Sequence, residues 1–426
     1  MHEQVEVVSP RLARLQAELE ADNATAVDTF WQEIATQGTP LIEPVAGEDR
    51  QVLLTWLWRH SAGTRNVVVV GGLAGADLIG NQMQRLPDTD VWYLTRKVRD
   101  DLRTTYQIAP NDPLTSLSEI RSWEEWLRRT AHWRPDPLNP RRLMHPRSPE
   151  EPDSAERVES IIELPAAAPY PWIEHRPGVP QGAVEPRRIQ SSVLNDAYRV
   201  WIYTPLGYAT EHEPHDLLVL FDGRDHLELI PAPTTLDNLL FDGAIPPTVA
   251  VLVESPTIEA RMRDLNCYPP FVAFLTDELI PWVRGNYHVT TDPRRTTVGG
   301  VSLGGLAAAC TSLTRPDIFG NVLSQSGAFW WKPEEDPEPE WVTRQFVARS
   351  RLPLRFYIDV GLMEPESQLT TNRHLRDVLQ AQAYPLRYVE YNGAHDYLSW
   401  RGLLGDGLMW LAGGSRSGGG KAVERT

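Results

Sequence analysis

Apolar residues repeat along this chain at helical spacing in some stretches and as short strand-like runs in others. Near the N-terminus Leu12, Leu15 and Leu19 fall on one stripe, and Trp31 and Ile34 continue it, which predicts a helix over residues 9–36. From about residue 37 to 110 the chain carries short β-rich runs, separated by turns that contain Gly, Pro and Asp. These predicted strands cover residues 51–58, 66–70 and 90–97. Their spacing predicts a small β-sandwich.

Beyond residue 187 the pattern changes to continuous apolar runs that alternate with helical segments. Strands are predicted at residues 197–204, 216–222, 248–254, 295–301, 321–326, 354–360 and 386–391. Continuous apolar runs are typical of strands that are buried on both faces. Helical spacing over residues 270–284 is one of the intervening signals. The alternation therefore predicts a parallel sheet with helices on both faces.

A stretch dense in proline and charge, residues 134–187, separates these two patterns. Its composition disfavours regular structure and is typical of a linker. The whole chain has 426 residues, which favours two domains. We predict a β-sandwich domain with a leading helix over 1–150, a Pro-rich linker over 151–187, a catalytic domain over 188–412 and a disordered tail over 413–426.

The strongest chemical signal is Gly300-Val301-Ser302-Leu303-Gly304, which fits the G-x-S-x-G nucleophile elbow. The preceding residues 295–298 are predicted as a strand and residues 306–313 as a helix, which is the context that the motif requires. Small residues on either side of the serine allow the backbone to approach itself closely. The motif predicts an α/β-hydrolase domain with Ser302 as nucleophile, and the N–H of Leu303 as one oxyanion donor. The alternative is a glycine-rich turn with an incidental serine.

In this fold the acid and then the histidine follow the serine along the chain. His395 lies in a turn directly after the last predicted strand and is the candidate base. Glu364 follows the strand before it and is the candidate acid, with Asp359 and Glu366 as rivals. Asp396 is adjacent to the histidine and therefore poorly placed to orient it. A surface histidine and a solvated carboxylate without a role are the alternatives.

The turn after the strand at residues 216–222 is the usual source of the second oxyanion donor. We predict that the N–H of Gly223 or of Arg224 takes this role. A simple tight turn is the alternative.

Charge and cysteine content narrow the class of protein further. Lys and Arg number 41 against 57 Asp and Glu, a formal net charge of −16, and such a field disfavours nucleic acid as a partner. The N-terminus lacks a signal-peptide pattern and no apolar stretch approaches the roughly 20 residues of a membrane helix, so we expect a cytoplasmic protein without membrane insertion. Cys267 and Cys310 are far apart in sequence without metal-ligand spacing, so we expect no disulfide, no metal and no cofactor.

Several longer motifs resemble the enterobactin (enterochelin) esterase family. The C-terminal half carries Leu220-Phe221-Asp222-Gly223, Arg261-Met262-Arg263-Asp264-Leu265, Glu278-Leu279-Ile280-Pro281, Leu323-Ser324-Gln325-Ser326-Gly327 with Trp330-Trp331, and Gly393-Ala394-His395-Asp396 with Trp400-Arg401-Gly402. The N-terminal half carries Phe30-Trp31, Gly38-Thr39-Pro40-Leu41, Thr55-Trp56-Leu57-Trp58 and Asp136-Pro137-Leu138-Asn139-Pro140. The Ser-Gln-Ser-Gly run with its tryptophan pair is more specific than the elbow motif alone.

The resemblance implies hydrolysis of the trilactone backbone of a ferric catecholate siderophore, with a β-sandwich cap domain ahead of the hydrolase. An iron–tris-catecholate complex is anionic and aromatic, so guanidinium groups and indole rings suit it. The candidate binding residues are Arg224, Arg261, Arg263, Trp330, Trp331 and Arg401. Ordinary ion pairing and core packing are the alternatives for each of them.

Two positions depart from the family pattern and would shift substrate preference without changing the chemistry. Tyr268 stands where a polar residue such as asparagine is expected, and Asp264 stands where a glutamate is usual. Two other functions are consistent with the same residues. One is an esterase for a feruloyl or acetyl sugar ester, and the other is a siderophore-binding protein without catalysis.

Overall fold

The computed structural model describes residues 9–72, 78–116, 120, 122–147, 156–208 and 213–413. The tail predicted as disordered, apart from Gly413, and residues 151–155 of the predicted linker lie outside these ranges. The chain divides into two compact units. The N-terminal unit is Met1–Pro169 together with two short stretches, Met363–Pro365 and Asn392–Asp396. The C-terminal unit holds the rest of the chain from Tyr170 onward.

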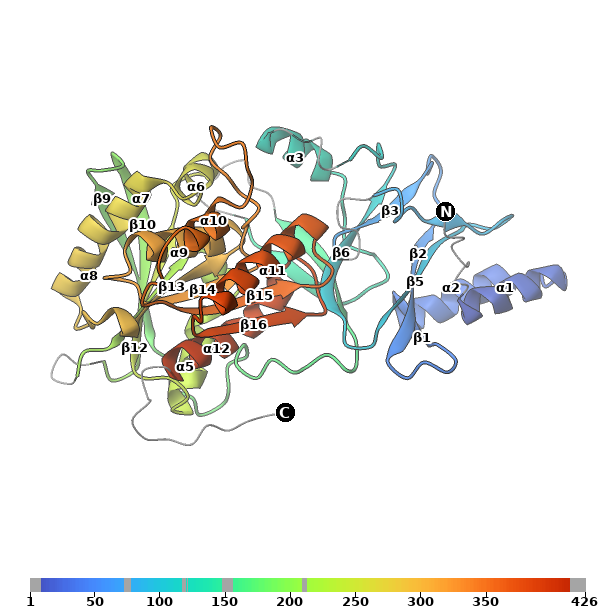
Figure 1. The fold of residues 1–426 in the computed structure, drawn as a ribbon. Coiled ribbons are helices and arrows are strands. Elements are labelled where there is room, and N and C mark those ends of the chain that lie inside the picture. Colours follow the sequence, from blue (N-terminus) through green and yellow to red (C-terminus); the bar gives the residue numbers. More distant parts are fainter. Residues whose placement is uncertain are drawn as a thin grey trace. The chain divides into compact units, whose positions relative to one another are not determined.

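The N-terminal unit contains three helices and eight strands among its described residues (Figure 1). The helices are α1 (Pro10–Glu20), α2 (Ala26–Gln37) and α3 (Trp123–Thr130). The strands are β1 (Leu41–Pro44), β2 (Gln51–Arg59), β3 (Val67–Val70), β4 (Gln84–Arg85), β5 (Val91–Arg99), β6 (Arg103–Pro110), β7 (Arg142–His145) and β8 (Arg157–Glu163).

Two four-stranded sheets, β1-β2-β5-β4 and β3-β6-β8-β7, form a sandwich in this unit. Alternate residues of each strand point inward, as the two-residue period of a strand requires. Trp56 of β2, Trp92 of β5 and Tyr106 of β6 belong to one shared apolar core between the sheets. The predicted β-sandwich is confirmed.

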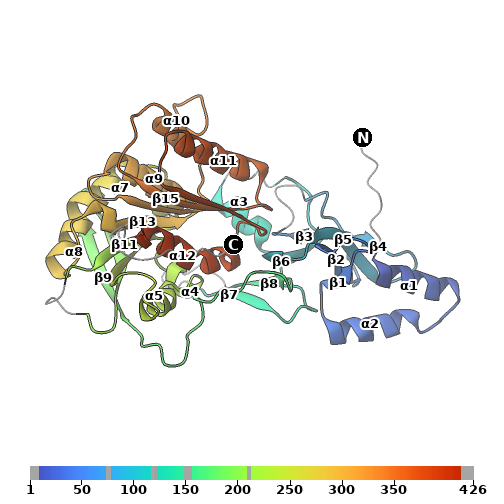
Figure 2. The same ribbon diagram turned by 60° about the horizontal axis from the view of Figure 1, so that its bottom comes forward.

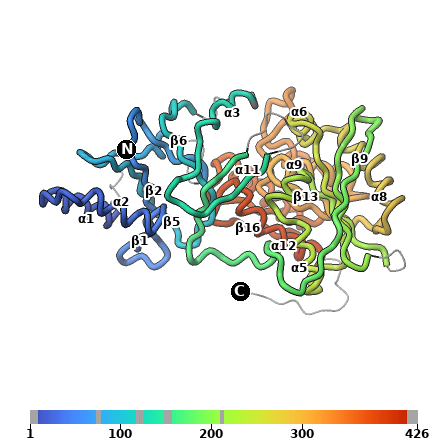
Figure 3. Tube along the Cα trace, turned by 180° about the vertical axis from the view of Figure 1, so that it is seen from behind, coloured from blue at the N-terminus to red at the C-terminus, as the bar shows by residue number. Residues whose placement is uncertain are grey.

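Helices α1 and α2 cover the outer face of the first sheet, where Leu57 and Val91 meet Leu15 and Phe30 (Figure 3). The single helix predicted over residues 9–36 is therefore two helices. The break follows Glu20, and Asp22 adopts a left-handed backbone with φ 57°. One amphipathic pattern spans both helices because both bury their apolar faces in the same place.

The C-terminal unit holds a single large sheet and most of the helices. Its strands are β9 (Ala183–Ser191), β10 (Asp196–Thr204), β11 (Asp216–Phe221), β12 (Thr248–Glu254), β13 (Thr296–Val301), β14 (Asn321–Gln325), β15 (Arg355–Gly361) and β16 (Leu386–Tyr391). Its α-helices are α4 (Asp225–Glu228), α5 (Ala232–Phe241), α6 (Ile258–Asp264), α7 (Pro269–Ala273), α8 (Ile280–Asn286), α9 (Leu303–Thr314), α10 (Trp341–Val347), α11 (Glu366–Ala381) and α12 (Tyr397–Gly413). A π-helical stretch, η2 (Phe274–Leu279), joins α7 to α8, and a 3₁₀ turn, η3 (Pro293–Arg295), precedes β13.

The strand order is β16-β15-β14-β13-β11-β12-β10-β9. All seven strands predicted for this half are present, and the run from β16 to β12 is parallel. The prediction of a wholly parallel sheet is wrong at one edge, where β10 runs antiparallel to both β12 and β9. No helix separates β9 from β10, so this pair forms a hairpin, with Asn195 left-handed in its turn.

Helices cover both faces of this sheet (Figure 2). One face packs against α7, α8, α9, α10 and α11, with Leu217, Val219 and Phe221 of β11 pointing toward them. The other face packs against α5 and α12, with Leu218 and Leu220 of the same strand pointing that way. Burial on both faces explains why these strands are continuous apolar runs. The predicted α/β architecture is confirmed.

Strand β8 lies inside the predicted linker, residues 151–187, and β9 overlaps its C-terminal end. Strand β8 pairs with β6 and β7, and β9 is the edge strand of the large sheet. Residues 157–163 contain no proline, and an edge strand tolerates the Pro186 of β9 because one side of its backbone needs no partner. Composition averaged over the whole stretch concealed both strands.

Cys267 and Cys310 form a disulfide with their Cα atoms 5.5 Å apart, so the prediction of a disulfide-free chain is wrong. Their separation of 43 residues in sequence does not reflect their distance in space. Cys310 lies on α9 and Cys267 in the loop after α6, and both pack against the same core. Within the described ranges, no helix is both long enough and apolar enough to cross a membrane.

Removing this crosslink should destabilise the C-terminal unit. Closing a loop of 43 residues restricts the unfolded chain, so Cys310→Ala should lower the free energy of unfolding by about 2–4 kcal/mol. Urea unfolding with and without reductant measures this effect, and a Cys267→Ala/Cys310→Ala variant should not respond to the reductant. Equal urea midpoints for the oxidised and reduced wild-type protein would contradict the expectation.

Candidate active site

Ser302 lies on a sharp turn between β13 and α9, in the C-terminal unit. Its backbone has φ 55° and ψ −116°, a conformation that residues with a side chain rarely adopt. Such a turn raises the serine side chain above the carboxyl edge of the sheet at the first turn of a helix. The structure therefore has the strand–turn–helix geometry that the sequence motif predicts.

Two glycines, Gly300 and Gly305, make this turn sterically feasible. A Cβ atom on Gly300 would lie 2.9 Å from the backbone of Gly304, closer than atoms can approach without a shift. A Cβ atom on Gly305 would lie 2.5 Å from the hydroxyl of Ser324 in the neighbouring strand. The glycines of the motif thus permit contacts of backbone with backbone and of helix with strand.

The loop after β14 supports the serine from the side. The Ser302 N–H donates to the Gln325 carbonyl at 2.8 Å, and the Ala328 N–H donates to the Ser302 carbonyl at 3.1 Å. The buried amide of Gln368 on α11 donates to the carbonyls of Ser326 and Gly327. These hydrogen bonds hold Ser302 through its own backbone.

His395 and Glu364 form a direct pair. The histidine Nδ1 lies 2.7 Å from Glu364 Oε2, and the carboxylate side chain is fully buried, while about a third of the imidazole side chain is exposed. Both residues belong to the N-terminal unit, although they follow β15 and β16 in sequence. A buried carboxylate on Nδ1 favours the tautomer whose Nε2 can accept a proton.

The rival acids lie elsewhere. Asp359 is buried and accepts from the Gln325 amide at 3.0 Å, and Glu366 is exposed at the start of α11. The Asp396 carboxylate accepts from Thr104 and from the N–H of Thr105. Of the carboxylates considered from sequence, the described contacts of His395 include only that of Glu364.

The two N–H groups of the predicted oxyanion loop both donate hydrogen bonds within the protein. The Gly223 N–H donates to the Val253 carbonyl at 3.0 Å, and the Arg224 N–H donates to Glu254 Oε2 at 2.8 Å. Gly223 is thus held by the neighbouring strand, and a Cβ on it would collide with Leu252. Each of the two N–H groups thus has an acceptor in the structure, and a role for either as oxyanion donor stays a prediction.

Arg261, a candidate substrate-binding residue, contacts the turn after β11. Its guanidinium forms a bidentate ion pair with Asp222, both contacts at 2.7 Å, and Asp222 is buried with a left-handed φ of 56°. Although burial opposes the charge, the Asp222 carboxylate raises the pKa of Arg261 above its ordinary value. This ion pair fixes the turn after β11, and a substrate contact through Arg261 stays a prediction.

The remaining predicted binding residues differ in exposure. Arg263 pairs with Asp264 at 2.8 Å and is partly exposed, and Arg224 contacts Glu228 at 3.1 Å. Arg401 is half-buried on α12. Trp330 is exposed and its indole N–H donates to Gln368 at 2.7 Å, whereas Trp331 packs against Trp341 at the edge of the core.

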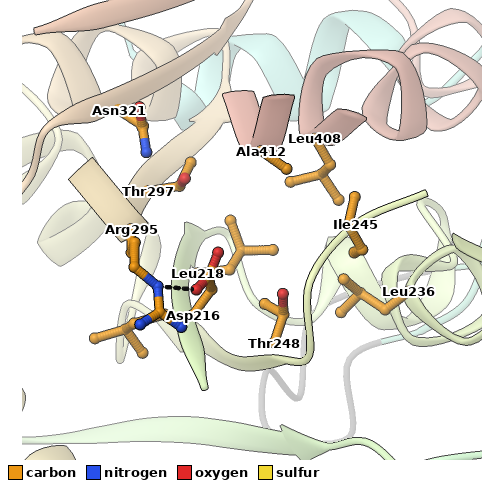
Figure 4. Close-up of a pocket in the computed structure, with 11 residues that line it drawn as sticks. Asp216, Leu218, Leu236, Ile245, Thr248, Arg295, Thr297, Asn321, Leu408 and Ala412 are labelled. Atoms are coloured by element: carbon orange, nitrogen blue, oxygen red, sulfur yellow. Dashed lines mark hydrogen bonds and ion pairs between the residues drawn. The ribbon is translucent and has the colours of Figure 1, made fainter. Parts of the chain in front are cut away.

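Figure 4 shows a small cavity in the C-terminal unit, and Ser302 is not among the residues that line it. It holds about 30 Å³ and lies at the amino ends of the parallel strands, beside the ion pair of Asp216 with Arg295. The carboxyl ends, where ligands bind in open α/β sheets, are at the opposite edge. Within the part of the chain that the structure describes, no cluster of three or more His, Cys, Asp or Glu side chains could hold a metal ion.

Comparison with known proteins agrees with this geometry. A family model described as "Putative esterase" matches residues 191–411, and one described as "Enterochelin esterase, N-terminal" matches residues 53–173. An iron(III) enterobactin esterase of Escherichia coli O6:H1 is 30% identical over 77% of this chain and 81% of its own length.

Solved structures extend the likeness to the fold. The ferric enterobactin esterase of Salmonella typhimurium has a TM-score of 0.73 at 26% identity, covering 90% of this chain and 98% of its own. The enterobactin esterase of Shigella flexneri in the presence of enterobactin has a TM-score of 0.69 at 27% identity, covering 88% and 96%. From its elbow, its two-unit fold and these matches, the chain belongs to the enterobactin esterase family.

Proposed function

We propose that this chain is a serine esterase that hydrolyses the trilactone backbone of a ferric catecholate siderophore. The observation that carries the proposal is the backbone of Ser302, whose strained turn presents a hydroxyl at the start of a helix. The iron belongs to the substrate. Opening the lactone ring removes the preorganisation of its three catechols and so weakens iron binding.

In the proposed reaction the Ser302 hydroxyl attacks the ester carbonyl while His395 takes its proton. Strands β13, β15 and β16 are parallel, so the chain leaves all three at the same edge of the sheet, which supports this grouping. The tetrahedral intermediate expels the alcohol oxygen, which receives the proton from His395, and an acyl-enzyme remains. Water, deprotonated by His395, then releases the acid. Glu364 stabilises the imidazolium in both steps.

The N–H of Leu303, at the positive end of α9, is the proposed first donor to the oxyanion. The Arg224 N–H is the proposed second donor. To take this role it must release the Glu254 carboxylate and donate to the substrate oxyanion instead. Burial, with the charges of Asp222 and Asp225, raises the pKa of Glu254 to about 7. Near neutral pH this carboxylate is thus readily protonated, which weakens it as a competing acceptor.

The proposed binding residues are those of the candidate set that remain accessible to solvent. Arg263 is partly exposed and Trp330 presents an exposed indole, a cation and a flat aromatic that suit an anionic catecholate. In this proposal Arg261 acts indirectly, because its ion pair with Asp222 fixes the turn after β11. The family match favours this substrate class over a feruloyl or acetyl sugar ester.

Replacing the nucleophile separates an enzyme from a binding protein. Ser302→Ala should lower kcat for trilactone hydrolysis by at least about 10³-fold, because the attacking oxygen is removed. Chromatography of the products measures turnover, and quenching of tryptophan fluorescence measures binding, which should persist. Unchanged turnover would reject the mechanism.

The acid can be tested with a close neighbour as its control. Glu364→Gln should lower kcat by about 10²–10⁴-fold, because an amide no longer stabilises the imidazolium or selects its tautomer. Glu366→Gln changes an exposed carboxylate two residues away and should leave kcat within about twofold. Similar losses in both variants would argue against a specific role for Glu364.

Glu254 should make stability depend on pH. The raised pKa means that the folded chain binds a proton more tightly than the unfolded chain, so this stabilisation is present below about pH 4.5 and is lost as the pH rises through about 7. Glu254→Gln, which carries no charge, should therefore raise the melting temperature at about pH 8.5 and change it little at about pH 4. Thermal unfolding, with the exposed Glu335→Gln as control, tests this. An equal shift at both pH values would refute it.

A further inference from the structure

The stretch that carries His395 is anchored on both sides of the histidine. Before it, the Asn392 carbonyl accepts from the Arg103 N–H at 3.0 Å, and the Asn392 amide donates to Asp101 at 2.7 Å. After it, Asp396 Oδ2 accepts from the Thr104 hydroxyl at 2.7 Å and from the Thr105 N–H at 3.3 Å. All of these residues belong to the N-terminal unit, and the anchors lie at the start of β6.

The histidine sits in a tight turn between these anchors. The Asp396 N–H donates to the Ala394 carbonyl at 3.0 Å, so the backbone closes around His395 alone. The acid is connected to the same stretch, because the Met363 N–H donates to the Gly393 carbonyl at 2.9 Å. The Met363 side chain packs against the core of the sandwich.

The hydrogen bond between Thr104 and Asp396 is buried. Thr104 is fully buried and Asp396 is 7% exposed, so water does not replace the hydroxyl if it is removed. A Cβ on Gly72 would lie 2.7 Å from the Thr104 hydroxyl, so the chain at Gly72 closes the space behind it. Arg103 is the first residue of β6. Its side chain donates a hydrogen bond of 2.7 Å to Glu163 of β8, which fixes its position.

We propose that Thr104 and Asp396 are positioning residues for His395, so that strand β6 of the sandwich sets the orientation of the base. This inference rests on the proposed function, since it takes His395 as the base. The sandwich then has a role in the chemical step besides any contact with substrate. Neither Thr104 nor Asp396 touches the reacting atoms in this scheme.

The isosteric change Thr104→Val removes the hydroxyl and leaves the shape of the core. Because a misplaced catalytic group slows reaction more than binding, kcat should fall about 10-fold while KM stays within about twofold. The limb of the pH–rate profile that reports the base should also shift, since the imidazole loses its fixed setting. Thr104→Ser restores the hydroxyl and should restore both kcat and the profile.

A matched control lies in the opposite sheet of the same sandwich. Thr55 and Thr95 are buried and their hydroxyls form a hydrogen bond of 3.0 Å. Thr55→Val removes a comparable bond far from the His395 stretch in sequence, so it should lower the melting temperature without changing kcat or the pH profile. If Thr104→Val does not fold, Asp396→Asn tests the same bond from its other end, with the same expected loss.

Two substrates separate failure of this inference from failure of the proposed function. Each variant is assayed with the ferric trilactone and with 4-nitrophenyl acetate, because a base acts on any ester. If the wild-type protein cleaves only the acetate, the proposed substrate is rejected, but the acetate assay still tests the role of Thr104. A wild-type protein that cleaves neither rejects the esterase and the positioning role together. If wild type is active and Thr104→Val keeps its kcat and pH profile, or loses no more than Thr55→Val, the positioning role alone is overturned.

Discussion

The backbone of Ser302 is the constraint on which the rest of the C-terminal unit depends. A left-handed φ at a residue with a side chain costs free energy, of order 1–3 kcal/mol, and persists only when the surroundings enforce it. Here β13 and α9 enforce it from either end, and the carbonyl of Gln325 and the N–H of Ala328 fix the residue between them. The glycines at 300 and 305 are needed because a Cβ atom at either position would collide with a neighbouring residue.

The candidate catalytic groups are divided between the two compact units. The serine and the turn with Asp222 and Arg261 belong to the C-terminal unit, whereas Glu364 and His395 belong to the N-terminal unit despite their late position in sequence. The sandwich holds these two loops by backbone and side-chain hydrogen bonds from β6 and by the packing of Met363.

The sequence predicted those features that depend on local pattern. The seven strands named for the C-terminal half, three strands of the sandwich, the elbow and the identity of the partner of His395 follow from periodicity, from glycine spacing and from chain order. Features set by pairing between distant residues were missed. The bond of the Arg224 N–H to Glu254, the ion pair of Arg261 with Asp222 and the bridge from Cys267 to Cys310 join residues 30, 39 and 43 positions apart. No pattern within a short window records such pairs. The strand β10 was predicted, but its antiparallel direction was missed for a related reason. The same apolar run is consistent with a hairpin and with a crossover connection.

The bridge between Cys267 and Cys310 has a topological consequence. The ring that it closes contains all of β13 and Ser302, so the proposed nucleophile lies inside a covalent loop that also spans α7, η2 and α8. A protease that cuts one peptide bond within this ring would leave a single covalently joined molecule, with both new ends tethered close to the helix that begins at the serine. A cut outside the ring would divide the chain into two polypeptides that no covalent bond joins.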